Sequence, residues 1–118
     1  MTYNFLKKQF STSTNGRPIG ISATASPGTL IHTAVTGSIH LDEVYVYAVN
    51  NATGSGTITV EQGGSAEYDR VSVLLPPSSG SILVIPGAPL NGGLEVRAYF
   101  TTSGSCNVTG WVNRIEDL

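Results

Sequence analysis

The residues with the greatest catalytic potential in this chain are two histidines and two close pairs of acidic side chains. The histidines are His32 and His40. A cupin-type metal site needs two closely paired histidines together with a carboxylate and a further ligand, and this count is not reached. No Gly-x-Ser-x-Gly motif, which presents a nucleophilic serine on a sharp turn, accompanies them. The sequence therefore predicts solvated or hydrogen-bonded structural histidines and does not favour a hydrolase.

The acidic pairs are Asp42-Glu43 and Glu67-x-Asp69. Paired carboxylates can serve glycoside hydrolysis or calcium binding when they converge. Asp42 and Glu43 are neighbours in a predicted strand, so their side chains point to opposite faces. Glu67 and Asp69 share a face if the next strand has begun there, but charged residues at a strand start often protect a sheet edge. We predict no catalytic residue, no metal, no cofactor and hence no enzyme.

Aromatic residues are the third group with a possible binding role. Tyr45, Tyr47, Tyr99 and Trp111 could form a platform for sugars. Aromatic residues at alternating strand positions, however, more often pack across strands or form an interface. We predict that Tyr45, Tyr47 or Trp111 serves packing between subunits of an oligomer.

Short alternating segments separated by Gly, Pro, Asn and Ser position these side chains. Eight strands are predicted, at residues 18–24, 29–35, 41–50, 57–62, 68–75, 81–85, 94–101 and 106–115. Strands at this spacing are typical of a β-sandwich or barrel. We predict an all-β domain over residues 18–118, a single antiparallel β-sandwich of about eight strands. A jelly-roll-like topology is favoured because the single Cys and single Trp do not fit an immunoglobulin pattern.

Residues 1–17 differ in composition from the rest of the chain. They carry Tyr3, Phe5, Leu6 and Phe10, followed by a polar stretch with a turn signal at Asn15-Gly16. Fully extended, this segment spans roughly 55 Å, enough to reach a neighbouring subunit. We predict an extended N-terminal arm that attaches through these four apolar residues; the alternative is a terminus that packs nowhere.

The composition limits the possible partners of the domain. Charged residues make up 12% of the 118 residues, about half of the usual ~25%, so the surface is largely neutral. A net charge of −2, with Lys7-Lys8 as the only adjacent basic pair, argues against nucleic-acid binding. No apolar run approaches the ~20 residues of a membrane span. Cys106 is the only cysteine, which excludes a disulfide within the chain.

Several turn and strand patterns resemble small virion proteins of tailed bacteriophages. The resembling segments cover about the last hundred residues and carry no active site. They are residues 15–19 (NGRPI), 27–34 (PGTLIHTA), 41–50 (LDEVYVYAVN), 82–87 (ILVIPG), 91–98 (NGGLEVRA) and 108–115 (VTGWVNRI).

This resemblance implies an auxiliary structural protein of the phage particle, of the capsid decoration or cement type. Such a protein would be a homo-oligomer, with a trimer favoured, would bind the major capsid protein on the capsid exterior, and would be assembled in the host cytoplasm. Its action would be binding alone, without turnover. Two alternatives remain open: a head-tail connector or tail-associated structural protein, and a carbohydrate-binding module of a receptor-binding tip.

Overall fold

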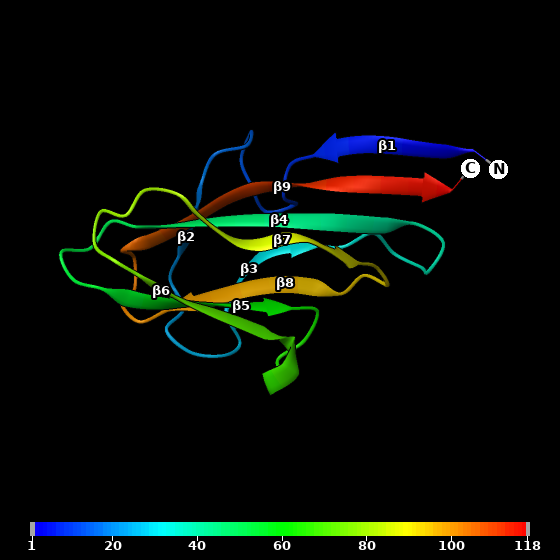
Figure 1. Cartoon of the computed structure of the whole chain (residues 1–118). Helices are drawn as coiled ribbons and strands as arrows, with labels where there is room; N and C mark the ends of the chain where they lie inside the picture. The colour runs from blue at the N-terminus through cyan, green and yellow to red at the C-terminus, as the bar shows by residue number, and fades with distance from the viewer. Residues whose placement is uncertain (1, 118) are drawn as a thin grey trace.

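The chain folds into two antiparallel sheets packed face to face (Figure 1), in a computed structural model that describes residues 2–117. The five-stranded sheet has the order β1-β9-β4-β7, and β2 also pairs with β9, beyond the end of β1. The four-stranded sheet has the order β3-β8-β5-β6. The strands are β1 (Tyr3–Lys8), β2 (Ile19–Ile21), β3 (Thr29–Thr33), β4 (Leu41–Asn50), β5 (Gly56–Gln62), β6 (Arg70–Leu75), β7 (Ile82–Leu90), β8 (Glu95–Phe100) and β9 (Cys106–Asp117).

The predicted all-β sandwich is confirmed, with nine strands among residues 2–117 rather than about eight. Each predicted strand segment overlaps an observed strand. The largest differences in length are at β2, which is shorter than predicted, and at β7, which continues through Pro86-Gly87 to Leu90 instead of ending at Ile85. Proline is tolerated there because β7 is an edge strand, so a missing N–H costs no hydrogen bond within the sheet. Among residues 2–117, the only helical element is a short 3-10 turn, η1 (Glu67–Asp69). No helix in this part of the chain could span a membrane.

The N-terminal segment departs from the predicted arm. Residues 3–8 form β1, which pairs antiparallel with the C-terminal half of β9, so both lie side by side at one end of the molecule (Figure 1). Phe10 is only 3% exposed and belongs to the core. The segment that follows is bonded to β3: the Ser11 hydroxyl accepts from Thr33 N at 2.8 Å and the Thr12 hydroxyl donates to Leu30 O at 3.2 Å. Residues 3–12 are therefore part of the sandwich.

The core lies between the sheets and follows the period of two along each strand. On β4, Val44, Val46 and Ala48 are fully buried, while Tyr45 and Tyr47 on the other face are half-buried. The opposite wall of the core comes from the four-stranded sheet. Its fully or almost fully buried residues include Ile58, Val60, Val96, Ala98 and Phe100.

Gly110 in β9 allows Phe10 to reach this core. Its φ of 147° lies outside the range that L side chains readily adopt. A Cβ at this position would overlap the carbonyl oxygen of Tyr45 and come within 2.9 Å of the Phe10 ring. The close contact of β4, β9 and Phe10 thus depends on a missing side chain.

We expect Gly110→Ala to lower the free energy of unfolding by at least about 2 kcal/mol, because backbone atoms of two central strands must separate. Urea unfolding followed by circular dichroism measures the change. Gly20→Ala is the matched control, since Gly20 also lies in a strand beside β9 but a Cβ there meets no atom within 4 Å. A control variant that loses as much stability as Gly110→Ala would contradict this explanation.

Candidate functional site

The side of the five-stranded sheet that faces away from the core is rich in aromatic and aliphatic side chains, and we call it the outer face. Strand register places these side chains on one side: Tyr45 is paired with both Trp111 and Pro86, and Tyr47 with Leu83. The apolar members of the outer face include Tyr3, Phe5, Leu41, Tyr45, Tyr47, Leu83, Pro86, Trp111 and Ile115. No described segment of the chain forms a further layer over this face.

Three aromatic rings and one cation form the centre of the outer face. The Trp111 ring stacks with that of Tyr45 at a centroid distance of 5.0 Å and with that of Tyr47 at 5.8 Å. The Lys7 ammonium lies 4.5 Å from the centroid of Trp111, within the range of a cation–π contact. Gly87 leaves space for Tyr45, because a Cβ there would come within 2.8 Å of the tyrosine ring. Tyr45, Tyr47 and Trp111, which the sequence predicts for packing between subunits, thus lie together on this face.

This stacking limits what the aromatic cluster can bind. A sugar stacks on an open aromatic face, whereas Trp111 is already in contact with two rings and with Lys7. All three rings are half-buried. The arrangement suits packing against another protein surface better than stacking on a pyranose.

The N-terminal residues predicted for attachment divide into three groups. Tyr3 and Phe5 lie on the outer face and are 51% and 69% exposed. Leu6 is half-buried and points to the other side of β1. Phe10 is a core residue, so the prediction that it contacts a partner is wrong. The physical reason is that the chain leaves β1 toward β3, to which Ser11 and Thr12 are hydrogen-bonded, and this places the ring in the core.

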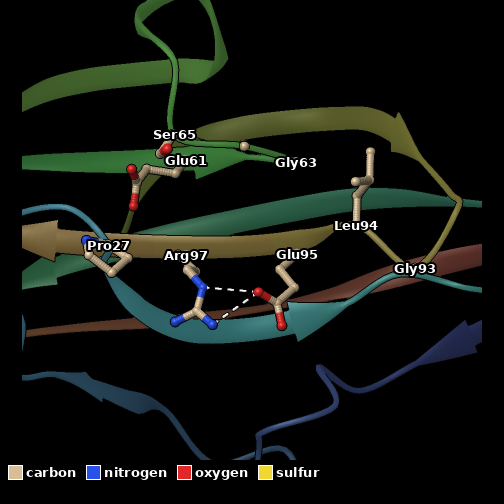
Figure 2. Close-up of a pocket in the computed structure, with 9 residues that line it drawn as sticks. Pro27, Glu61, Gly63, Ser65, Gly93, Leu94, Glu95 and Arg97 are labelled. Carbon is tan, nitrogen blue, oxygen red and sulfur yellow. Dashed lines mark hydrogen bonds and ion pairs between the residues drawn. The ribbon is translucent and has the colours of Figure 1, made fainter.

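A hollow of about 340 Å³ lies on the opposite side of the molecule, against the four-stranded sheet (Figure 2). Its polar lining comes mainly from Glu61, Glu95 and Arg97. The Glu61 carboxylate is only 2% exposed, accepting a hydrogen bond from Ser26 Oγ at 2.6 Å and one from Gly28 N at 2.8 Å.

The remaining charged groups of this hollow are also paired. Arg97 donates to Glu95 Oε1 at 2.9 and 3.1 Å and to Gly28 O at 3.0 Å (Figure 2). The Arg70 guanidinium lies 3.9 Å from Glu61. These bonds hold the loop around Ser26 and Gly28 across the sheet. Since the carboxylates and Arg97 already serve one another and the backbone, the hollow is explained by loop anchoring.

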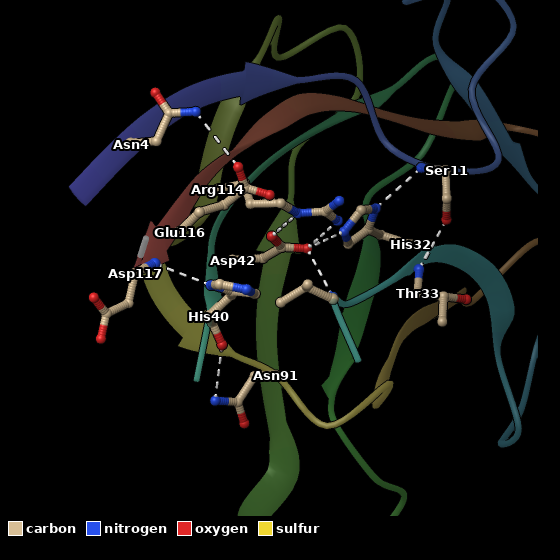
Figure 3. Close-up of polar contacts among 11 residues, drawn as sticks. Asn4, Ser11, His32, Thr33, His40, Asp42, Asn91, Arg114, Glu116 and Asp117 are labelled. Atoms are coloured by element: carbon tan, nitrogen blue, oxygen red, sulfur yellow. Dashed lines mark hydrogen bonds and ion pairs between the residues drawn. The ribbon is translucent and has the colours of Figure 1, made fainter. Parts of the chain in front are cut away.

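A second polar cluster lies at the edge of the core, around the fully buried carboxylate of Asp42 (Figure 3). Arg114 donates to both of its oxygens, at 2.7 and 3.0 Å, and Val35 N donates at 3.1 Å. His32, 2% exposed, is bonded to Asp42 through Nε2 at 2.8 Å. The Nδ1 atom of His32 accepts from the backbone N–H of Ser11 at 3.0 Å.

This Ser11-His32-Asp42 arrangement differs from a catalytic triad in its donors. The atom of Ser11 that meets the histidine is the backbone nitrogen, while the hydroxyl accepts from Thr33 N. Because Nδ1 accepts, a neutral His32 carries its proton on Nε2 and donates it to Asp42. The prediction of hydrogen-bonded histidines therefore holds for His32, and His40 likewise accepts from Asp117 N at 3.0 Å.

Burial raises the pKa of Asp42, but hydrogen bonds from Arg114 and His32 and the charge of Arg114 outweigh it. The net result is a pKa below the usual value of an aspartate. The same pairing raises the pKa of Arg114. Both groups are thus held in their charged forms, and the pair is a structural link between β4 and β9.

The predicted acidic pairs do not converge. Asp42 faces the core and Glu43 the outer face, as their neighbouring positions in one strand require. Glu67 and Asp69 lie in η1 rather than at the start of a strand, and Asp69 accepts a hydrogen bond from Ala66 N at 3.1 Å. Among residues 2–117, no group of three or more His, Cys, Asp or Glu side chains could hold a metal ion.

Lys7 and Leu83 are among the residues of the outer face that sequence reasoning missed. Lys7 was treated only as a charge, although the alternation of residues 3–8 places it on the same side of a strand as Phe5. Leu83 was assigned to a short strand without a face. Its neighbour across the sheet, Tyr47, is separated from it by 36 residues, and two register shifts between β4 and β7 hide the pairing.

Comparison of the sequence with protein-family models finds no match, and comparison with curated proteins finds none either.

We expect stability to fall in acid as Asp42 becomes protonated. A carboxylate with a lowered native pKa contributes stability above its ordinary pKa, and this contribution is lost as pH falls through the native pKa. Asp42→Asn should cost about 3 kcal/mol at pH 7, because Arg114 loses its charged partner, and unfolding should then depend less on pH between about 5 and 2. Urea unfolding at several pH values measures both. Glu95→Gln is the control: it breaks a partly exposed ion pair with Arg97 and should cost under about 1 kcal/mol. If the free energy of unfolding fell equally with acid in wild type and Asp42→Asn, Asp42 would not be the group responsible.

Cys106 should be inert in the folded protein. It is 2% exposed, and burial raises the pKa of its thiol to about 11. At pH 8 only about one thiol in a thousand is then the reactive thiolate. We expect labelling by a disulfide reagent such as Ellman's to be at least about a hundredfold slower in buffer than in 8 M urea. Fast labelling of the folded protein would show that this region opens.

Proposed function

We propose that the protein is an auxiliary structural protein of a tailed-phage particle, a capsid decoration protein that binds the major capsid protein on the capsid exterior through its outer face. The observation that carries this proposal is the outer face itself. Aromatic and aliphatic side chains from four strands gather there, and the exposed Phe5 and Leu83 border a stacked aromatic centre. Large exposed apolar patches on small domains commonly mark interaction sites.

The low charge of the chain supports the same proposal. Neutral polar surface costs less to desolvate than charged surface, so dense packing on a lattice is favourable. The outer face also has the composition of an interface centre, with aromatic residues and only a few charges such as Lys7 and Glu43. Attachment would come from burial of these side chains, with no chemical turnover.

We further propose that the sandwich is a jelly roll. With β2 taken as the first of eight strands, the sheets read β2-β9-β4-β7 and β3-β8-β5-β6. This order is consistent with two interleaved Greek keys, and jelly rolls occur in viral capsid proteins as well as in lectins and cupins. The fold alone does not select among these functions, so the proposal depends on the outer face.

Copy number on the particle is the first test. Quantitative mass spectrometry of phage particles that carry this protein gives its amount relative to the major capsid protein. We expect on the order of hundreds of copies, in a ratio that matches the capsid lattice. A dozen copies or fewer would favour a head-tail connector or tail protein, and complete absence from particles would refute a virion role.

The attachment surface is tested by binding to capsid shells that lack the protein. Leu83→Lys places a charge on the outer face at a position that is 43% exposed, so folding should be retained. We expect affinity for shells to fall at least about tenfold. Leu74→Lys is the matched control, because Leu74 is 65% exposed on the four-stranded sheet. Equal affinities of the two variants would exclude the outer face as the attachment surface.

A further inference from the structure

We propose that two copies of the chain associate through the free edge of β1, pairing antiparallel about a two-fold axis so that their five-stranded sheets become one continuous sheet. This inference does not depend on the proposed function. It follows from the free edges of the two sheets and from the distribution of apolar and charged side chains along β1.

The edge of β1 is open, whereas two other edges are obstructed. Within residues 2–117, β1 pairs with β9 alone. On β7, Pro86 and Pro89 lack the N–H groups that a further strand needs. On β3, the Ser11-Thr12 segment already occupies backbone groups of Leu30 and Thr33. The outer edge of a strand that pairs on one side is a ready template for another strand.

Two edges remain: β2 has only three residues, and β6 is less suited to a second copy. A two-fold pairing centred on Ser72 would place Arg70 opposite Leu74 of the other copy, so no opposite charges would meet. Since β1 is then the favoured edge of each copy, β1 of one copy pairs with β1 of the other. This geometry gives a two-fold dimer instead of the homotrimer predicted from the resemblance.

An apolar row on the outer face ends at the β1 edge. Leu41, Ile115 and Phe5 lie opposite one another on β4, β9 and β1. Phe5, the last member of the row, is 69% exposed. In a pairing centred on Phe5, the two phenylalanines face each other and the row continues into the second copy without interruption. Cross-strand aromatic pairs of this kind stabilise sheets.

The same register brings opposite charges together on each side of the axis. Lys7 of one copy then lies opposite Tyr3 of the other, and Asp117 is the next residue in that row, on β9. Strands are about 4.8 Å apart, so the two backbones are separated by about 10 Å, which the two side chains can span. Within one copy, Lys7 and Asp117 are four positions apart along the strands, about 13 Å.

The pairing surface is small, so we expect association that depends on concentration. One added strand pair buries less than the area typical of stable interfaces, which corresponds to a transient dimer. Analytical ultracentrifugation from about 5 µM to 1 mM should show the mass rising from 12.3 kDa toward twice that value, with a dissociation constant on the order of 10–100 µM. A monomer throughout this range would refute the proposal.

The edge is identified by a pair of matched variants. Phe5→Lys removes the aromatic pair and places like charges on the two-fold axis, so dimerisation should weaken at least tenfold. Leu74→Lys makes the same type of change on the β6 edge and should leave dimerisation unchanged. Loss of the dimer in Leu74→Lys but not in Phe5→Lys would assign association to β6 and overturn the proposal.

A charge swap tests the register without changing the centre. Lys7→Asp gives two acidic rows in its own dimer and Asp117→Lys gives two basic rows, so each variant alone should dimerise more weakly than wild type. When the two variants are mixed, every row joins an acidic side chain to a basic one, and a mixed dimer should form at least tenfold more readily than either homodimer. Absence of preferential mixing would exclude this register.

Hydrogen exchange provides a readout that needs no variant. Amide groups on the free edge of β1 become bonded only in the dimer, so residues 3–8 should exchange at least several-fold more slowly at 500 µM than at 5 µM. The β6 segment, residues 70–75, is the internal control and should not change. Protection that rises with concentration in β6 and not in β1 would refute pairing through β1.

Discussion

Burial of the Asp42 carboxylate between the sheets is the constraint on which the organisation of this end of the sandwich depends. A buried charge is tolerated only when it is paired and hydrogen-bonded. Arg114 supplies the charge from β9, and His32 and Val35 supply donors from β3 and the residues after it. His32 in turn accepts from the backbone of Ser11. One carboxylate thus joins β4 to β9, connects the two sheets and holds the chain that leaves β1.

This polar link determines what the outer face can present. Side chains alternate between the two faces of a strand. Since Arg114 points inward to Asp42, residues of β9 at odd separations from it point outward, and Trp111, three positions away, is one of them. The same alternation on β1 buries neither Phe5 nor Lys7, and Lys7 reaches the Trp111 ring. The same strands therefore carry the polar network on their inner face at this end and the apolar side chains on their outer face.

Much of the fold could be predicted from the sequence because alternation and turn residues mark eight strands directly. The N-terminal strand was missed because its apolar residues, Phe5 among them, indicated a docking arm; its true partner, β9, lies more than 100 residues away. Local patterns carry no information on such pairing. The aromatic cluster was anticipated from residue type, whereas the burial of Phe10 and the Asp42 network depend on contacts between distant segments, which no spacing rule reveals.

Pairing through β1 and attachment through the outer face are mutually compatible. A two-fold axis perpendicular to the sheet leaves both outer faces on the same side, so the dimer presents two aromatic clusters to one surface. Two weak attachments joined by a rigid sheet act at high effective concentration, provided that the spacing of their targets matches. Weak pairing then has a physical advantage: single copies remain free in solution, and a repeating surface that holds two neighbours side by side favours the β1 contact. Under the proposed function, the association of copies would thus depend on the repeating surface to which they attach.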